Sequence, residues 1–521
     1  MRLIPILAAA ILASLALAPA SMAQEADNRP IIKIGVATLP DGLDPGANVT
    51  NVGQRITYSV FDQLIKRAYW ASDKGDGADL VPSIAAAWHN VSPTEWDVDI
   101  QPGLKFQDGE PVTAEDVAFT FSQDHMWGAK RQVPTGPTYF PTLKDVTVVD
   151  DHTVKFTTSA PDPIFPKRFT SPLGMVLPKN YYQKVGPEGF NRAPIGTGPY
   201  KVIEFKPHEI IKLAANDNYF GGKPPAKEIW FMEIPEAATR ISGLLSGELD
   251  VITDVTPDQR STIEGAQGFS VKPALIDNNR IIQLNTNAPP MNNVNLRRAL
   301  VAAIDRQAIV KALWGGASVV PHLMNVPAHG DLYMPDRPIT PYDPAEAKKL
   351  LAQSHYAGET LHFRILAGYY TNYLEAAQIM QQMWKEAGIN VELEPRDSFA
   401  TLKQGTWDMA SASEGIQIND ASQPITGNYG RTSNLVNPKS GDYMWSPPKE
   451  LFDLIDSVNS SMDEAKRKAD FTKALDIVED RVPEIELFQT VEFYAIRDGL
   501  NWKPYSFWPM DFSARNLKIE K

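Results

Sequence analysis

The order of predicted elements between residues 361 and 393 constrains the fold more than any other feature. Residues 361–366 are expected to form a strand, and a helix follows that ends at Gly388. Apolar residues then alternate over 389–393, which predicts a second strand. A strand, a helix and a strand in this order are typical of a parallel, helix-covered unit. The chain is therefore expected to be an α/β protein with a partly parallel sheet.

Hydrophobic periodicity predicts further elements elsewhere in the chain. Residues 31–36 alternate as a strand, and residues 56–65 place apolar side chains on one side of a helix. Longer helices are expected over residues 296–314 and around residues 451–478. A chain of 521 residues with this mixture of elements is long enough for two or three domains.

The N-terminus has the pattern of a secretory signal peptide. A single basic residue precedes an apolar run, and the small residues Ser21 and Ala23 follow at the positions that a signal peptidase reads. Residues 1–23 are therefore expected to be removed and the mature protein to be periplasmic. No later segment has the roughly 18 consecutive apolar residues of a membrane span.

Cysteine and charge narrow the class of protein further. The sequence contains no cysteine, so an exported chain must depend on a large core instead of disulfides, and thiol nucleophiles and thiolate metal sites are excluded. The formal net charge of −13 argues against nucleic acid or an anionic membrane as a partner.

Residues 405–424 (GTWDMASASEGIQINDASQP) form the stretch most indicative of a binding site. Trp407 and Met409 alternate as a short strand, and small and amide residues then replace the apolar ones. A polar loop after a strand is typical of the lip of a ligand cleft, although an ordinary surface turn has the same composition. The candidate ligand contacts in this stretch are Ser411, Ser413, Gly415, Gln417 and Asn419.

Several motifs, taken in order, resemble one protein family. They cover nearly the whole mature chain and comprise residues 42–45 (GLDP), 80–121, 196–200 (GTGPY), 246–250 (SGELD), 295–305, 343–351 and 407–408. In this order they are similar to the family 5 extracellular solute-binding proteins, the peptide, opine and nickel receptors of bacterial ABC importers. The resemblance implies a receptor that binds a small molecule, hands it to membrane permease subunits, acts as a monomer and needs no cofactor.

The resemblance also implies a periplasmic-binding-protein-like architecture. Two hinged α/β lobes would close on the ligand, with a third, smaller domain inserted in the first lobe. The implied boundaries are 24–70, 194–279 and 500–521 for lobe I, 71–193 for the inserted middle domain, and 280–499 for lobe II.

The family's peptide receptors hold the free amine of a peptide with an aspartate in the loop after the strand at Trp407. The matching position here is Gln417, a neutral amide, and only Glu414 or Asp420 could replace the missing charge after a small loop shift. This departure favours a ligand rich in hydroxyl or phosphate oxygens. The sequence therefore predicts an opine or sugar-phosphate ligand of the agrocinopine type, with an oligopeptide as the alternative.

Other candidate contacts lie outside this stretch. Aromatic faces stack on sugar rings, so Tyr369 and Tyr370 with Asn372 are expected to line the second lobe, and Tyr139 to close the far end of the pocket. Core packing or an exposed surface would use the same residue types. Three arginines could hold an anion or form structural ion pairs, and the sequence does not choose among them: Arg55, Arg280 and Arg396.

Rival functions have weaker support. The sequence has no GxSxG elbow and no HExxH motif, which disfavours an exported hydrolase. The histidine pairs His322/His329 and His355/His362 lie near turns, so a nickel receptor stays open, although no metal ligand is predicted. An adhesive or chaperone-like protein would use the acidic surface instead of a cleft.

Overall fold

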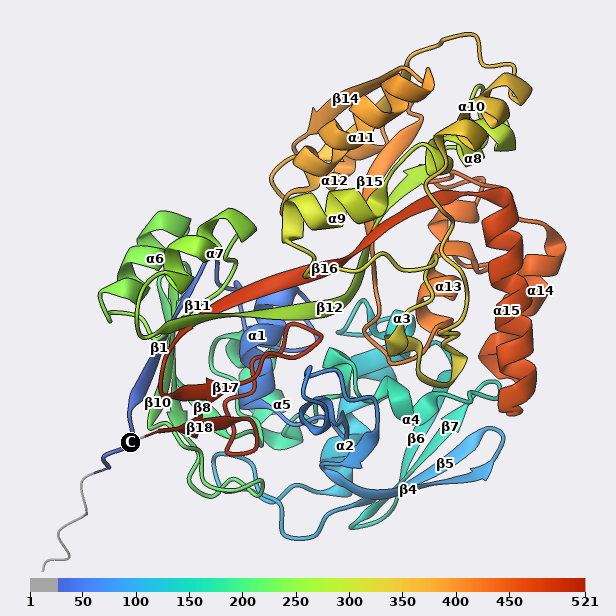
Figure 1. Cartoon of the computed structure of the whole chain (residues 1–521). Helices are drawn as coiled ribbons and strands as arrows, with labels where there is room; N and C mark the ends of the chain where they lie inside the picture. The colour runs from blue at the N-terminus through green and yellow to red at the C-terminus, as the bar shows by residue number, and fades with distance from the viewer. Residues whose placement is uncertain (1–26, 521) are drawn as a thin grey trace, which may run out of the picture.

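The computed structural model describes residues 27–520, so the predicted signal peptide lies outside the described residues. The chain folds into two α/β lobes and a smaller domain that lies beside the first lobe and below the second in Figure 1. Within the described part of the chain, none of the helices is both long and apolar enough to cross a membrane. The sequence prediction of a mixed α/β fold with two lobes is confirmed.

One ten-stranded mixed sheet runs through both lobes. Its strands, in spatial order, are β14 (Val391–Arg396), β13 (Leu361–Leu366), β15 (Met409–Gly415), β12 (Phe269–Leu284), β16 (Glu484–Arg497), β11 (Val251–Ile252), β1 (Ile31–Val36), β10 (Glu228–Glu233), β9 (Ile210–Ala215) and β8 (Tyr200–Lys206). β13 and β14 are parallel neighbours in the sheet, and α11 (Tyr373–Ala387) connects them along the chain. This confirms the strand–helix–strand prediction.

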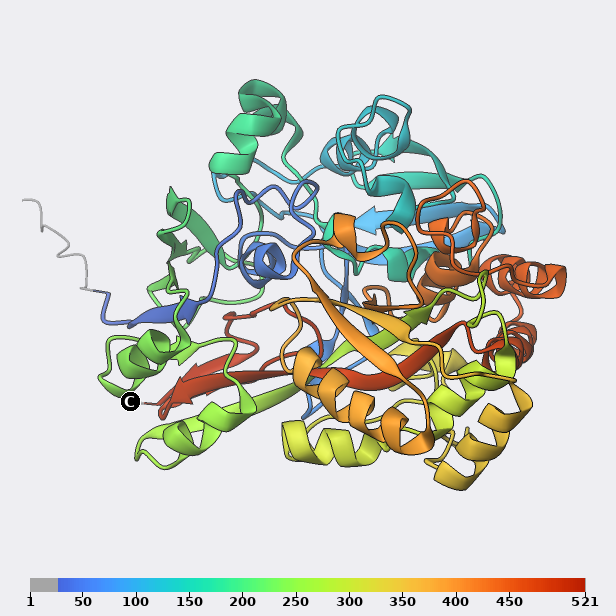
Figure 2. The same cartoon turned by 90° about the horizontal axis from the view of Figure 1, so that it is seen from above.

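The long strands β12 and β16 connect the lobes. They run side by side from one lobe to the other in both views (Figures 1 and 2). Their antiparallel pairing is interrupted between Leu275 and Asn279 and shifts again after Arg280. Such irregularities bend a strand pair, so the strands change direction where they pass from one lobe to the other.

Helices cover both faces of this sheet. The helices around the first lobe are α1 (Asn51–Val60), α5 (Lys179–Arg192), α6 (Ala237–Leu245) and α7 (Pro257–Glu264), and the small strands β17 (Leu500–Trp502) and β18 (Leu517–Ile519) pair beside them. The second lobe has α8 (Val294–Ala302), α9 (Arg306–Trp314), α10 (Pro344–Gln353), α11, α12 (Phe399–Leu402), α13 (Ser422–Tyr429), α14 (Lys449–Ser460) and α15 (Glu464–Arg481).

The smaller domain is built on its own antiparallel sheet. Its strands lie in the order β4 (Ala85–Ser92), β5 (Glu95–Ile100), β7 (Thr153–Thr158) and β6 (Leu143–Asp150), with the short helices α2 (Ala114–Thr120), α3 (Gly136–Tyr139) and α4 (Phe165–Arg168). The pair β2 (Ile65–Arg67) and β3 (Leu80–Pro82) leads into it. Phenylalanine rings from several of these elements pack edge to face in its core.

Three predicted helices differ from the observed ones because short polar side chains set the boundaries. Residues 296–314 form two helices, since the Asp305 carboxylate accepts a hydrogen bond from the Ala308 amide and starts α9. Asp463 starts α15 in the same way and divides the helix predicted over 451–478. The helix predicted over 56–65 is α1, which starts after the N-cap Thr50 and ends at Val60.

The polar stretch after Trp407 was expected to be a loop from Ser411 onward, and this is wrong. Strand β15 continues to Gly415, because residues 411–415 pair with β12 from Ile282 to Asn278. The backbone ladder requires no apolar side chain, so small and polar residues can extend a strand that is protected by its neighbours. The loop begins at Ile416.

Three glutamates lie buried on one face of the second lobe's sheet. Glu414 of β15 and Glu484 and Glu486 of β16 are at most 3% exposed, and no described Lys or Arg side chain forms an ion pair with them. Burial raises the pKa of all three carboxyl groups, to about 7 for Glu484, and mutual repulsion raises those of Glu414 and Glu486 further. The native state therefore favours their protonated forms.

Candidate functional site

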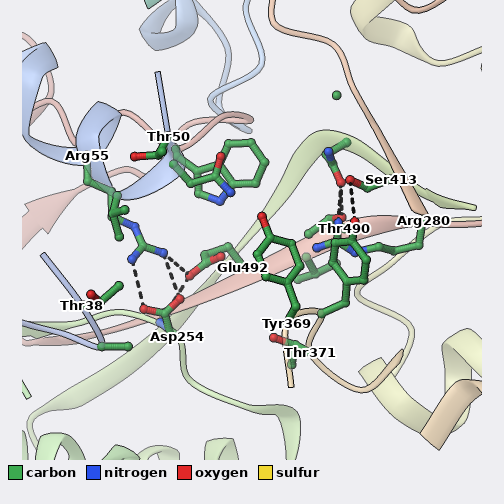
Figure 3. Close-up of a pocket in the computed structure, with 18 of the residues that line it drawn as sticks. Thr38, Thr50, Arg55, Asp254, Arg280, Tyr369, Thr371, Ser413, Thr490 and Glu492 are labelled. Carbon is green, nitrogen blue, oxygen red and sulfur yellow. Dashed lines mark hydrogen bonds and ion pairs between the residues drawn. The ribbon is translucent and has the colours of Figure 1, made fainter. Parts of the chain in front are cut away.

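A cavity of about 620 Å³ lies between the two lobes. The first lobe contributes Thr38, Thr50, Arg55, Asp254 and Trp508, the long strands contribute Asn278, Arg280, Phe488, Thr490 and Glu492, and the second lobe contributes Trp314, Tyr369, Tyr370, Thr371, Ser413, Gly415 and Gln417. A ligand here would touch both lobes and the strands that connect them. Figure 3 shows these side chains from several elements converging on the cavity.

One side of the cavity is formed by an ion-paired arginine. Arg55 of α1 donates to the carboxylates of Asp254 at 3.0 and 3.1 Å and of Glu492 at 2.9 Å (Figure 3). Burial and the neighbouring Asp254 raise the pKa of Glu492 to about 8. Burial also opposes ionisation of Asp254, but the attraction of Arg55 outweighs it and lowers the pKa of Asp254 below its usual range. The three groups therefore carry little net charge together.

The opposite side holds a second arginine in a different setting. Arg280 of β12 donates one hydrogen bond to Asn278 Oδ1 at 2.8 Å, and its guanidinium lies 4.2 Å from the centre of the Tyr370 ring. Thr490 donates to the same Asn278 oxygen at 3.0 Å and fixes that amide. Within residues 27–520, no carboxylate lies within ion-pairing distance of Arg280. Burial lowers the pKa of this guanidinium.

A family model agrees with this two-lobed architecture. The model described as bacterial extracellular solute-binding proteins, family 5 Middle, matches residues 79–435, well over half of the chain. The chain belongs to family 5 of the bacterial extracellular solute-binding proteins. The resemblance found in the sequence motifs is thereby confirmed.

Individual family 5 proteins are distant relatives over most of their length. The peptide transport periplasmic protein SapA of Salmonella typhimurium is 24% identical over 460 residues, which cover 82% of each chain. Among solved structures, the substrate-binding protein CtaP of Listeria monocytogenes has a TM-score of 0.83 at 22% identity, covering 95% of this chain and 100% of its own. AgaA of A. tumefaciens R10, solved with agropinic acid, has a TM-score of 0.77 at 22% identity, covering 94% and 100%. These relatives are binding proteins, and the structural likeness shows the fold.

The structure brings some of the predicted ligand contacts of this family 5 chain together. Tyr369, Tyr370, Ser413, Gly415 and Gln417 line the cavity. An adjoining hollow of about 920 Å³ shares Tyr369, Tyr370 and Ser413 with it and continues along the second lobe.

The remaining predicted contacts have other positions. Ser411 is buried and accepts a hydrogen bond from the Leu366 amide at 2.9 Å, although it reaches the adjoining hollow. The Asn372 amide donates to the Leu313 carbonyl at 3.3 Å and lies outside the cavity lining. Asn419 and Tyr139 also lie outside the lining and contact other parts of the chain.

The loop after β15, residues 416–420, docks onto the smaller domain and is called the docking loop below. Ile418 has no exposed surface and belongs to the same apolar cluster as Phe165 and Phe169 of the smaller domain. The Asn419 amide donates to the carbonyl of Ala78 at 3.1 Å. The second lobe and the smaller domain are therefore in direct contact at one end of the cleft.

Polar side chains add to this contact. The Tyr139 hydroxyl donates to Gln417 Oε1, so the tyrosine reaches the cavity only through the glutamine. Lys167 Nζ lies 3.3 Å from the Asp420 carboxylate, which Arg467 also contacts at 2.8 Å. Asp420 is fully buried and paired, so it does not replace the missing acidic group at position 417.

Glu414 does not replace the missing acidic group at position 417 either. Its side chain points away from the cavity lining, accepts a hydrogen bond from Asn428 at 2.7 Å and lies among the buried glutamates. The acidic side chains that line the cavity are Asp254 and Glu492, both already in contact with Arg55.

Several cavity residues were not found by reasoning from the sequence. Arg280 was weighed only as one of three arginines, and Thr38, Phe488, Thr490 and Trp508 were not considered. Thr490 and Glu492 stand two residues apart in β16 and so share one face, but the strand also carries Glu484, Glu486 and Gln489, so its pattern does not single them out. Arg396, by contrast, forms an ion pair with Glu394.

The histidines show no arrangement suited to a metal. No set of three His, Cys, Asp or Glu side chains within residues 27–520 is placed to hold an ion. His322 lies 3.3 Å from Glu479, and His362 lies 2.8 Å from Glu394. His329 is buried, and burial lowers its pKa to about 4.

Proposed function

We propose that this chain is the periplasmic receptor of an ABC importer and that it carries a solute of short-peptide size between its lobes. The observation that supports this most directly is the 620 Å³ cavity whose walls come from both lobes. Only a ligand that contacts both lobes stabilises the closed arrangement more than the open one, which is what a transport receptor requires. The signal-peptide pattern of residues 1–23 agrees with export to the periplasm.

Short peptides are the ligand class that the relatives support best. Peptides recur in the names of the curated relatives. The cavity volume lies within the range of pockets that enclose a drug-sized molecule, and its walls combine aromatic rings with a few polar groups. The opine or sugar-phosphate ligand favoured by the sequence is therefore the second candidate.

One observation supports the second candidate, an opine or sugar-phosphate ligand. Gln417 is neutral, and both acidic groups of the cavity contact Arg55, so no free carboxylate faces a peptide amine within the described lining. A ligand without a free peptide N-terminus avoids this requirement, and AgaA, which shares the fold, was solved with an opine, agropinic acid.

A thermal-shift screen tests the proposal. We expect pools of di- and tripeptides to raise the Tm of the full-length mature protein, and to do so more than agropinic acid or an agrocinopine. At a ligand concentration 100 times the Kd, the expected stabilisation is about 2.7 kcal/mol. Mass spectrometry should recover the ligand unchanged. Turnover of the ligand would indicate an enzyme, and the absence of any shift with all these solutes would contradict a receptor for either class.

Replacing Gln417 with alanine should weaken binding without unfolding the protein. The change removes one cavity-lining amide and the hydrogen bond from Tyr139. Loss of one hydrogen bond between this amide and the ligand costs about 0.5–1.5 kcal/mol, so the Kd should rise roughly 3- to 10-fold. Calorimetry measures the Kd, and circular dichroism checks the fold. The variant Tyr139→Phe is the matched control: it removes the same hydrogen bond but leaves the Gln417 amide in the cavity, so its Kd should stay close to that of the wild-type protein. Unfolding of Gln417→Ala would mark a structural role instead.

A further inference from the structure

We propose that Arg280 anchors a carboxylate of the ligand, and that the cleft selects its ligand by this carboxylate and not by a free amine. The inference rests on the proposed function, because it assigns the chemistry of the same cavity. Solutes with a free carboxylate should bind well, and otherwise identical solutes without one should bind weakly. For a peptide, the C-terminal carboxylate should therefore matter and the N-terminal amine should not.

Arg280 has the free donors that such an anchor needs. A guanidinium carries five N–H groups in a fixed fork, and Arg280 uses one of them, toward Asn278 Oδ1. Within residues 27–520, Arg280 Nε and Nη2 have no hydrogen-bond partner, neither atom is fully enclosed, and the residue lines the cavity. The remaining N–H groups are therefore available to a solute in the cleft.

The position of the guanidinium is fixed before a ligand arrives. Its plane is supported by the Tyr370 ring at 4.2 Å, and the Tyr370 hydroxyl donates to Ser413 Oγ at 3.3 Å. On the other side, Thr490 holds the Asn278 oxygen that accepts from Arg280. A preorganised fork matches the two oxygens of a carboxylate and loses little freedom on binding.

The charges around Arg280 favour one anionic group of the ligand beside this guanidinium. Arg280 is half-buried, and burial lowers its pKa, so the charged form gains from an anionic partner. Across residues 27–520, the salt bridges of the cleft involve Arg55 and not Arg280. One guanidinium balances one carboxylate, which leaves the Arg280 side of the cleft neutral when the ligand is bound.

The other end of the cleft offers little to an amine. Asp254 and Glu492 are the acidic side chains in the lining, and each contacts Arg55 within 3.1 Å. An ammonium group placed there would compete with Arg55 instead of meeting a free charge. Removing the positive charge of a ligand's amine should therefore change its affinity little.

The experiment compares the two ends of the same peptides. Three pools of di- and tripeptides of matched sequence are used: unmodified, N-acetylated with a free carboxylate, and with a free amine and a C-terminal amide. Kd values are measured by calorimetry with the full-length mature protein. We expect the N-acetylated pool to bind within about 3-fold of the unmodified pool, and the amidated pool to bind about 10- to 100-fold more weakly.

Variants assign this preference to Arg280. Arg280→Met should bind the carboxylate and amide pools equally, whereas Arg280→Lys should recover part of the preference because it keeps the charge without the fork. Arg396→Met is the matched control and should keep the wild-type ratio, since Arg396 pairs with Glu394 away from the cavity. The ratio of the two affinities reports on the carboxylate, and a purely structural role of Arg280 would lower both affinities together.

Each outcome decides the proposal. Equal binding of the acid and amide pools by the wild-type protein, or strong loss on N-acetylation, overturns it even if Arg280→Met fails to fold. If no peptide pool binds but agropinic acid does, the peptide proposal fails alone, and comparison of agropinic acid with its methyl ester then tests Arg280. If none of these probes binds, both proposals are overturned.

Discussion

Replacing Ile418 with aspartate is expected to open the two lobes and to weaken ligand binding strongly. This side chain has no exposed surface and packs in the apolar cluster of the smaller domain, so it joins the second lobe to that domain. An aspartate there would be an unpaired buried charge, which costs several kcal/mol, and separation of the lobes avoids that cost. Small-angle X-ray scattering should show a larger radius of gyration. The Kd should rise in inverse proportion to the fraction of molecules that remain closed.

Two controls distinguish opening from unfolding. Ile418→Val keeps an apolar side chain at the contact and should retain both the radius and most of the affinity. Circular dichroism of Ile418→Asp should keep the wild-type helix content, because the docking loop lies between β15 and α13 and outside both. A variant with unchanged radius and unchanged Kd would show that the docking loop does not hold the lobes together.

Raising the pH from 5 to 8 is expected to destabilise the protein through the buried glutamates. Burial raises the pKa of Glu484 to about 7, and burial and repulsion raise those of Glu414 and Glu486 as well. An unfolded glutamate has a pKa of about 4.3, so above this pH the native state holds protons that the unfolded state has lost. The free energy of unfolding then falls with rising pH, by up to about 1.4 kcal/mol per pH unit for each group.

A single substitution isolates one of these groups. Glu484→Gln keeps the size of the side chain and removes its titration, so its unfolding free energy should depend less steeply on pH between about 4.5 and 7. Chemical denaturation at several pH values measures this slope. The groups that face the glutamates, Tyr429 of α13 and Arg306 of α9, remain in both proteins.

The control for this comparison lies on the surface. Glu115→Gln on α2 should leave the slope unchanged, because the pKa of Glu115 is lowered by Lys179 and its carboxylate stays ionised in both states above pH 5. Equal slopes for Glu484→Gln and the wild-type protein would show that the buried carboxyl of Glu484 does not retain its proton.

Elements with a clear periodic pattern were predictable from the sequence. The β13–α11–β14 unit has regular spacing and ends its helix with Gly388 in a left-handed conformation, so local rules were sufficient. The division between α8 and α9 was not predicted. The Asp305 side chain caps a new helix, although the apolar pattern continues past this residue. The predicted strand at β15 was too short, because the strand that pairs with it, β12, is distant in the sequence.

The candidate site was only partly predictable for a related reason. Gln417 and Ser413 stood out because polar residues cluster around them, and both line the cavity. Arg280 and Thr490 lie on two strands more than 200 residues apart in the chain, and only the pairing of β12 with β16 brings them to one place. Neither strand alone indicates that its polar residues face a cavity.

The long strands also bear on how such a receptor could be re-engineered. Arg280, Thr490 and Glu492 belong to β12 and β16, which cross from one lobe to the other. A chimaera that exchanges a whole lobe with a relative would thus cut through the lining of the cavity itself. Transplanting the paired segments around positions 278–280 and 488–492 as one graft would keep this part of the donor's cavity lining intact.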